Sequence, residues 1–197
     1  MITVSVKDPE AIFQTAKTLR AGGVILYPTD TVYGLGALAS NSQAVETIYR
    51  IKERERGKPL LMAACSVEMI ERYAVMTSLA HTLSKRWPAP LSLILANKVD
   101  PRTSTGWRVP DSQFVLDVVS LLDEPIISTS ANISGISTEH TLAGVMAALG
   151  ENCEHIDLAI DVGTLNEGVP STLVDARGSS PIILRQGAIR SEEIVGQ

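Results

Sequence analysis

"VILYPTDTVYGLG", residues 24–36, joins an apolar run to a stretch of hydroxyl and carboxylate side chains. The apolar residues 24–27 predict a short buried strand. Gly34 and Gly36 are expected to let the backbone turn away from it. Segment 29–33 would then lie at the carboxyl end of a strand, where open sheets bind ligands, although ordinary turns use the same residue types.

Helix and strand signals alternate along the rest of the chain. Helices are expected to begin at Asp8, Asn41, Ser66, Thr77 and Asp111, with Asp8, Asn41 and Asp111 as N-caps. Two more are expected near 142–149 and from 191, with strands near 59–64, 91–96, 107–109, 126–127, 156–162, 173–175 and 182–184. Because several strands follow one another without a crossover helix, we expect a mixed sheet covered by helices, in one domain over 1–197.

Composition points to a globular protein that handles small anions. The chain is 45% hydrophobic and has a net charge of −5, which argues against a non-specific nucleic-acid coat. Residues 1–108 nevertheless hold 14 of the 17 Lys and Arg but only 9 of the 22 acidic residues. Small phosphates are therefore the expected partners.

The sequence also indicates a cytoplasmic protein without a structural metal. Cys65 and Cys153 are far apart and form no zinc-binding pattern. The first residues lack the basic and apolar regions of a signal peptide, and no apolar run is long enough to cross a bilayer. We expect a reduced, cytoplasmic setting and no membrane contact.

The run "IKERERGK", residues 51–58, is the first candidate for anion binding. If alternate residues beyond the helix end point the same way, Lys52 and Arg54 form a clamp for a polyphosphate, with Lys58 as a third positive contact. The alternative is a solvated helix end, since charged runs usually lie on the surface.

The segment "STSANISG", residues 128–135, follows a predicted strand and is the second candidate. Small hydroxyl side chains and a glycine allow backbone N–H groups to approach a phosphate. The alternative is a turn in which Ser and Asn satisfy their own backbone.

Other polar residues sit at strand ends. Arg108, in "GWRVP", can present its guanidinium to a carboxylate or can be an ordinary exposed side chain. Ser171 and Arg185 are weak candidates on their own. The chain has no GxxxxGK[ST] and no GxGxxG, and its histidines lie in no motif, so neither a Walker-type site nor a nucleophilic triad is supported.

Taken in order, "YPTDTVYGLG", Lys52-x-Arg54, "STSANISG" and "PSTLVD" followed by "ILRQGAI" resemble the YrdC-like family, the L-threonylcarbamoyladenylate synthases. The stretch "RWPAPLSLIL" adds to the match, which spans about 23–190. The resemblance implies a single three-layer α/β domain, in some schemes α+β, with a twisted mixed parallel and antiparallel sheet, flanking helices and a concave ligand cleft. In length the chain is similar to the short, single-domain bacterial form.

The resemblance also implies an activity, that of a nucleotidyltransferase. L-threonine, bicarbonate or CO₂, and ATP would give threonylcarbamoyl-AMP and pyrophosphate. Mg²⁺ would be held mainly by the ATP phosphates, without metal ligands from protein side chains. The product would pass to the downstream tRNA threonylcarbamoyl-transfer machinery. Alternatives are a diverged relative that hydrolyses threonylcarbamoyl-AMP, or an RNA-binding module with direct RNA contact, against which stand the acidic total and an aromatic content of 4%.

Site roles follow from the same match of positions. The nucleotide contacts are expected to be Lys52, Arg54, Lys58, Ser130, Asn132, Thr138 and Arg185. The threonine contacts are expected to be Thr31, Arg108, Ser128 and Ser171. Arg108 would hold the threonine carboxylate, and Lys52 and Arg54 would stabilise charge without covalent chemistry. Thr29 is the second choice after Thr31, and Asp30 and Tyr33 are expected to be structural.

Overall fold

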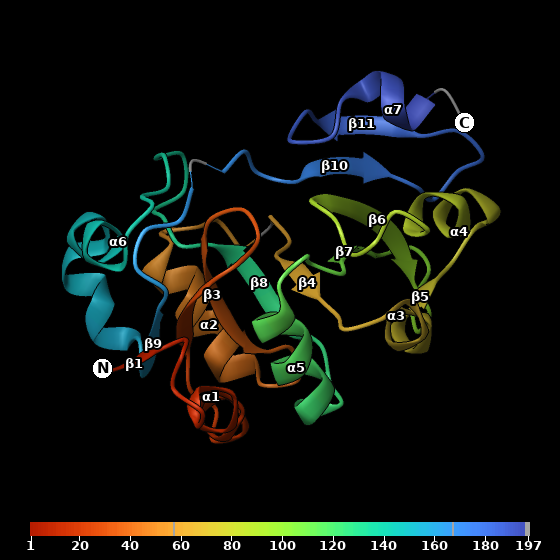
Figure 1. Cartoon of the computed structure of the whole chain (residues 1–197). Coiled ribbons are helices and arrows are strands. Elements are labelled where there is room, and N and C mark those ends of the chain that lie inside the picture. The colour runs from red at the N-terminus through yellow and green to blue at the C-terminus, as the bar shows by residue number, and fades with distance from the viewer. Residues whose placement is uncertain (57, 167, 196–197) are drawn as a thin grey trace.

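The computed structural model describes residues 1–56, 58–166 and 168–195. In this range the chain forms one mixed sheet with helices packed on it (Figure 1). The strands are β1 (Ile2–Ser5), β2 (Ile25–Pro28), β3 (Tyr33–Leu38), β4 (Leu61–Ala63), β5 (Ala74–Val75), β6 (Leu91–Asn97), β7 (Ser104–Arg108), β8 (Ile126–Ser130), β9 (Leu158–Asp161), β10 (Thr172–Asp175) and β11 (Ile182–Arg185). The helices are α1 (Ala11–Arg20), α2 (Ser42–Ile51), α3 (Val67–Tyr73), α4 (Ser78–Ser84), α5 (Gln113–Leu122), α6 (Leu142–Leu149), α7 (Ser191–Val195) and the short 3-10 helix Gly150–His155.

Strand order confirms the predicted mixed sheet. Neighbouring strands run β1-β9-β2-β3-β8-β4-β7-β6-β10-β11, and β5 pairs with β6. Four pairs, β1 with β9, β9 with β2, β4 with β7 and β6 with β10, are parallel, and the others are antiparallel. The order places β2, β3, β8 and β4 side by side in the middle of the sheet, and these strands carry much of the candidate site.

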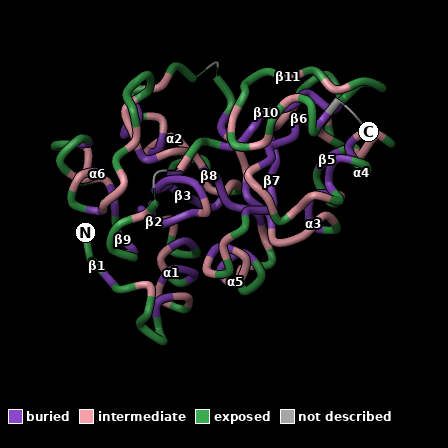
Figure 2. Tube along the Cα trace, turned by 45° about the horizontal axis from the view of Figure 1, so that its top comes forward, coloured by how far each residue is buried: buried purple, intermediate pink, exposed green. Residues whose placement is uncertain are grey.

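The helices form one layer on each face of the sheet, as predicted. Ile25 and Tyr27 of β2 pack in one core cluster with buried residues of α1, α3, α4 and α5. Leu26, between them, packs in a second cluster with residues of α2 and α6. This alternation is the two-residue period of a strand buried on both faces. Figure 2 shows the central strands largely in the colour of buried residues. In the part of the chain described, no helix is long and apolar enough to span a membrane.

The opening segment forms a hairpin instead of turning away after one strand. The prediction for Gly34 and Gly36 is wrong, because both lie within β3, where Gly34 is opposite Tyr27 of β2 and Gly36 is opposite Ser128 of β8. Glycine is depleted in strands, so the sequence pattern favoured a turn. The strands β1 and β5 are also absent from the prediction.

Helix starts are partly as predicted. The starts of α2, α3 and α4 are confirmed, with the capping side chains Asn41, Ser66 and Thr77. The other two predicted caps are wrong, because α1 begins at Ala11 and α5 at Gln113. The Asp8 carboxylate instead accepts a hydrogen bond from the N–H of Glu10 at 2.8 Å. Such a local side-chain turn competes with helix formation, which explains the later start of α1.

Candidate functional site

The side chain of Tyr27 extends from β2 across β3 to β8. Its hydroxyl donates to Oγ of Ser128 over 2.7 Å. A Cβ on Gly36 would lie 2.8 Å from Cε1 of Tyr27, so the ring occupies the space that a side chain at position 36 would need. Burial raises the pKa of Tyr27 to about 12. The phenol therefore stays a neutral donor, and the hydroxyl proton of Ser128 is left for another partner.

Thr29 and Thr31 shape the turn between β2 and β3. Oγ1 of Thr29 accepts from the N–H of Thr31 at 3.1 Å and donates to the carbonyl of Val32 at 2.7 Å. The two hydroxyl oxygens lie 3.1 Å apart. A Cβ on Gly168 would lie 1.8 Å from the carbonyl oxygen of Thr31, so the segment before β10 packs directly against this turn. Thr29 is thus occupied with the turn itself, and Thr31 remains the better candidate for a ligand contact.

Asp30 and Arg108 form a buried ion pair. Nη2 of Arg108 donates to Oδ1 of Asp30, and each side chain is only 7% exposed. Oδ2 of Asp30 and Nε of Arg108 are buried without a hydrogen-bond partner among the described residues. The sequence suggests only a structural role for Asp30 and contains no signal of this pairing. No spacing pattern signals a contact between residues 78 positions apart.

Arg185 and Ser171 lie beside this pair. Nη2 of Arg185 donates to the carbonyl oxygen of Ser171 at 2.8 Å and to its Oγ at 3.3 Å. Burial, and to a lesser extent the charge of Arg108, lower the pKa of Arg185. Ser92, fully buried on β6, has its hydroxyl 2.9 Å from that of Ser171. A lone serine in the apolar run of β6 is the signal that could have revealed this contact.

We refer to Asp30, Arg108, Ser171 and Arg185 as the arginine cluster. Its charge includes two guanidinium groups within electrostatic reach of each other and one carboxylate paired to Arg108. The Ser171 hydroxyl contacts Arg185 in this cluster. The Ser128 hydroxyl is bonded to Tyr27, and the pKa of Tyr27 responds to the charges of both Arg108 and Asp30. Such a site fits a small molecule with a carboxylate.

Lys52 lies at the end of α2 and points into the segment that follows β8. Its Nζ donates to the carbonyl of Ser130, to the carbonyl of Asn132 at 2.9 Å and to Oδ1 of Asn132 at 3.2 Å. Lys52 is only 2% exposed, and burial lowers its pKa to about 8. Oγ of Ser130 donates to Oδ1 of Asn132 at 2.5 Å. We refer to Lys52, Ser130 and Asn132 as the lysine cluster.

The expected extended arrangement of Lys52 and Arg54 is wrong. Lys52 is the αR C-cap of α2, and Glu53 adopts the left-handed region with φ +48°, so the chain turns between the two cations. Lys52 is directed inward. Arg54 instead bonds the carbonyls of Lys58 at 3.1 Å and Pro59 at 3.1 Å. Arg54 therefore holds the loop before β4, and its charge is a secondary cause of the lowered pKa of Lys52.

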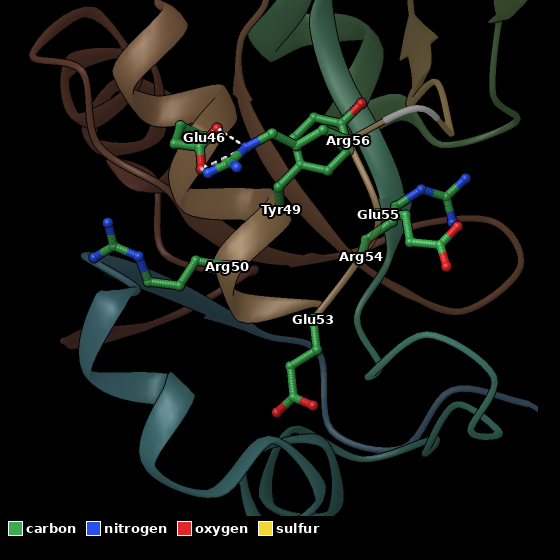
Figure 3. A pocket seen from close by; sticks show the side chains of 7 residues that line it. All are labelled: Glu46, Tyr49, Arg50, Glu53, Arg54, Glu55 and Arg56. Atoms are coloured by element: carbon green, nitrogen blue, oxygen red, sulfur yellow. Dashed lines mark hydrogen bonds and ion pairs between the residues drawn. The ribbon is translucent and has the colours of Figure 1, made fainter.

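A surface hollow of about 370 Å³ lies beside the end of α2 (Figure 3). It is lined by Glu46, Tyr49, Arg50, Glu53, Arg54, Glu55 and Arg56. Figure 3 shows Arg50 and Arg54 pointing away from each other and Arg56 turned back to Glu46, with which it forms an ion pair. Arg54 lines this hollow, and Lys52 does not.

Besides Arg54, two other predicted nucleotide contacts lie apart from the buried clusters. Lys58 is exposed, and its Nζ lies 3.0 Å from a carboxylate oxygen of Glu55. Thr138 is half-buried in the segment between β8 and α6. The structure thus brings Lys52 together with Ser130 and Asn132, and leaves Lys58 in a local surface pair.

The two clusters meet at β8. Ser128 and Ser130 are alternate residues of this strand, so their side chains share one face of the sheet. Ser128 accepts from Tyr27 beside the arginine cluster, and Ser130 belongs to the lysine cluster. A site for a carboxylate and a loop held by a buried ammonium group are therefore neighbours on one strand.

Fold and site together define a mixed α/β protein with two cationic clusters, which adjoin β8 of its sheet. A family model described as "Telomere recombination", that of the Sua5, YciO and YrdC proteins, matches residues 17–187. The chain belongs to the Sua5/YciO/YrdC family.

Named relatives and solved structures agree with this assignment. The chain is 37% identical to the threonylcarbamoyl-AMP synthase of Pyrococcus abyssi over 89% of its own length and 54% of that protein. It is 35% identical to the Bacillus subtilis protein of the same name, over 97% and 57%. The chain thus spans little more than half the length of these curated relatives.

Two solved structures share the fold over almost the whole chain. P. abyssi Sua5 complexed with L-threonine has a TM-score of 0.87 at 33% identity, covering 99% of this chain and 60% of that one. Escherichia coli YciO has a TM-score of 0.84 at 27% identity, covering 98% and 97%. The predicted fold class is confirmed.

Proposed function

We propose that the chain is an L-threonylcarbamoyladenylate synthase, which converts L-threonine, bicarbonate or CO₂, and ATP into threonylcarbamoyl-AMP and pyrophosphate. Family membership and the names of the P. abyssi and B. subtilis relatives support the proposal. The product would serve a cytoplasmic tRNA-modifying system, in which a downstream enzyme transfers the threonylcarbamoyl group to tRNA.

One observation supports the proposal most directly: the arginine cluster and the lysine cluster both adjoin β8, the first near Ser128 and the second at Ser130. Arg108 suits the carboxylate of an amino acid. Arg185, expected from the sequence to contact the nucleotide, bonds Ser171 in the same cluster and adds positive charge there. Segment 130–135, anchored by Lys52, would let a phosphate approach closely because its hydroxyl and amide side chains are small. The reaction requires these two ligands to be neighbours, because an atom of one must attack a phosphorus atom of the other.

In the proposed reaction the neutral threonine amine adds to CO₂ and loses a proton to solvent, or condenses with bicarbonate with loss of water, and either route gives a carbamate. A carbamate oxygen then attacks the α-phosphorus of ATP in line and expels pyrophosphate. This displacement needs orientation and charge stabilisation more than covalent assistance. Arg108, with the hydroxyls of Thr31, Ser128 and Ser171, would orient the amino acid. Lys52 would fix the phosphate-binding segment and supply positive charge.

Mg²⁺ would arrive with the triphosphate. Among the described residues no group of three His, Cys, Asp or Glu side chains could hold a metal ion, and Asp30, the carboxylate of the arginine cluster, is paired with Arg108. Oδ1 of Asn132 already accepts from Lys52 and Ser130, so the ion would be held by the ATP phosphates. The ion would neutralise phosphate charge.

The assay is release of pyrophosphate from ATP in the presence of Mg²⁺ and bicarbonate, with and without L-threonine. We expect release that requires threonine. Lys52→Ala should lower turnover on the order of 100-fold. Arg54→Ala should have a smaller effect, because Arg54 bonds the carbonyls of Lys58 and Pro59. Arg102→Ala is the matched control, since this exposed arginine pairs only with Asp100 among the described residues.

Two other outcomes would replace the proposal. Loss of added threonylcarbamoyl-AMP without its synthesis would identify a hydrolysing relative. Salt-sensitive RNA binding without ATP turnover would identify an RNA-binding module.

A further inference from the structure

The ion pair between Asp30 and Arg108 is incomplete. One oxygen of the carboxylate meets one nitrogen of the guanidinium, while Oδ2 of Asp30 and Nε of Arg108 have no partner among the described residues. Both side chains are more than nine-tenths buried. A buried acceptor and a buried donor without partners are unfavourable, so the pair resembles one half of a larger hydrogen-bonded arrangement.

The missing half needs an acceptor for Arg108 and a donor for Asp30. An α-amino acid carries both on one carbon atom, since its carboxylate accepts and its ammonium donates. The surrounding groups agree with such a ligand. Arg185 adds positive charge on the carboxylate side. The Ser128 hydroxyl accepts from Tyr27, so its own proton is left to be donated to the ligand. The negative charge available for an ammonium in the arginine cluster is that of Asp30.

We propose that Asp30 is a substrate-binding residue that accepts a hydrogen bond from the α-amino group of the amino acid through Oδ2 while it holds Arg108 for the carboxylate. The inference rests on the proposed function and deepens it, because it names Oδ2 of Asp30 as the acceptor for the amino group, whose nitrogen captures CO₂. The same oxygen accepts from the carbamate N–H after capture. Asp30 thereby selects amino acids over hydroxy acids.

The test compares two ligands by calorimetric titration, without turnover. One is L-threonine, and the other is the dihydroxy acid in which a hydroxyl replaces its ammonium group. The wild type should bind threonine more tightly by on the order of 100-fold, because Oδ2 of Asp30 meets a neutral hydroxyl instead of an ammonium group in the second complex. Asp30→Asn, which keeps the shape and the Oδ1 acceptor, should reduce this ratio to about threefold or less.

The matched control is Asp175→Asn. Asp175 also pairs with an arginine, Arg177 at 2.5 Å, at the end of β10, and is 12% exposed. It should leave the ratio unchanged. A thermal melt and a titration with a non-hydrolysable ATP analogue check that each variant is folded.

The outcomes separate the inference from the proposed function. Asp30 would act only by positioning Arg108 if Asp30→Asn weakens both ligands equally and keeps the ratio, and the inference would then be overturned. A wild type that binds both ligands equally overturns it without any variant. A wild type that binds no α-amino acid overturns the proposed function along with it.

Discussion

The hydroxyl of Tyr27 and Oγ of Ser128 are joined by a 2.7 Å hydrogen bond that crosses an entire strand. The bond exists because β3, which lies between the two residues, has glycine at the position beneath the ring. A glycine in the middle of a sheet is normally unfavourable. In this protein it makes room for a tyrosine that orients a hydroxyl of the site.

Gly36→Ala should therefore weaken both the fold and the binding of threonine. The new Cβ would lie 2.8 Å from Cε1 of Tyr27 and 3.0 Å from Cγ1 of Ile25, so the ring must move. We expect a loss of about 1–3 kcal/mol in the free energy of unfolding, as for other overpacked sites. Urea denaturation and threonine titration measure the two effects. Gly178→Ala, with its nearest atom 4.0 Å away, should show neither.

Tyr27→Phe should change how stability depends on pH. The pKa of Tyr27 is about 12 in the folded chain, against 10.0 for the ordinary phenol. Between these values only the unfolded chain loses the proton. The free energy of unfolding should thus fall by about 1.4 kcal/mol per pH unit from this residue. Denaturation of both chains from pH 9 to about pH 12 measures the slope, which should be shallower in the variant. Equal slopes would contradict a neutral buried phenol.

ATP affinity should decrease above about pH 8. Burial lowers the pKa of Lys52 to about 8, so its positive charge is present below that pH and is lost above it. Phosphate groups are already ionised there, and the dissociation constant should rise by up to about tenfold per pH unit. Titration of an ATP analogue between pH 7 and about pH 9.5 tests this. Lys52→Met should bind weakly at every pH, and an unchanged slope in this variant would show that another group titrates.

Ser92→Ala should weaken threonine binding although Ser92 is fully buried. Its hydroxyl lies 2.9 Å from that of Ser171, and its loss leaves Ser171 with Arg185 at 3.3 Å. We expect about a three- to tenfold rise in the dissociation constant, the effect of one neutral hydrogen bond. Ser84→Ala is the control, because Ser84 is also buried but bonds only the carbonyl of His81 in α4 among the described residues. Equal effects of the two substitutions would assign the result to general stability.

The sequence predicts the fold class because buried strands and capped helices are local patterns. The starts of α2, α3 and α4 follow from Asn41, Ser66 and Thr77, whose side chains bond the backbone three residues on. The second strand of the hairpin is not predicted, because its glycines leave space for the ring of Tyr27, which belongs to another strand.

The candidate site shows the same division. Lys52, Ser130 and Asn132 are selected by motif, and the structure brings them together. Their geometry is not predictable, since the left-handed conformation of Glu53 turns the chain after Lys52 and separates Lys52 from Arg54. The pairing of Asp30 with Arg108 depends on contact between the β2–β3 turn and the end of β7, and no local pattern encodes it.

The position of Ser128 and Ser130 on β8 has a consequence for the spacing of the two substrates. Alternate residues of a strand lie about 7 Å apart along its axis, and covalent geometry together with the pairing of Ser128 and Ser130 to β3 keeps that length constant. The strand therefore fixes the distance between the amino acid and the phosphate. The distance that a carbamate oxygen must cover is then set by the most rigid element of the protein, and loop motions around the site can admit or release ligands without altering it.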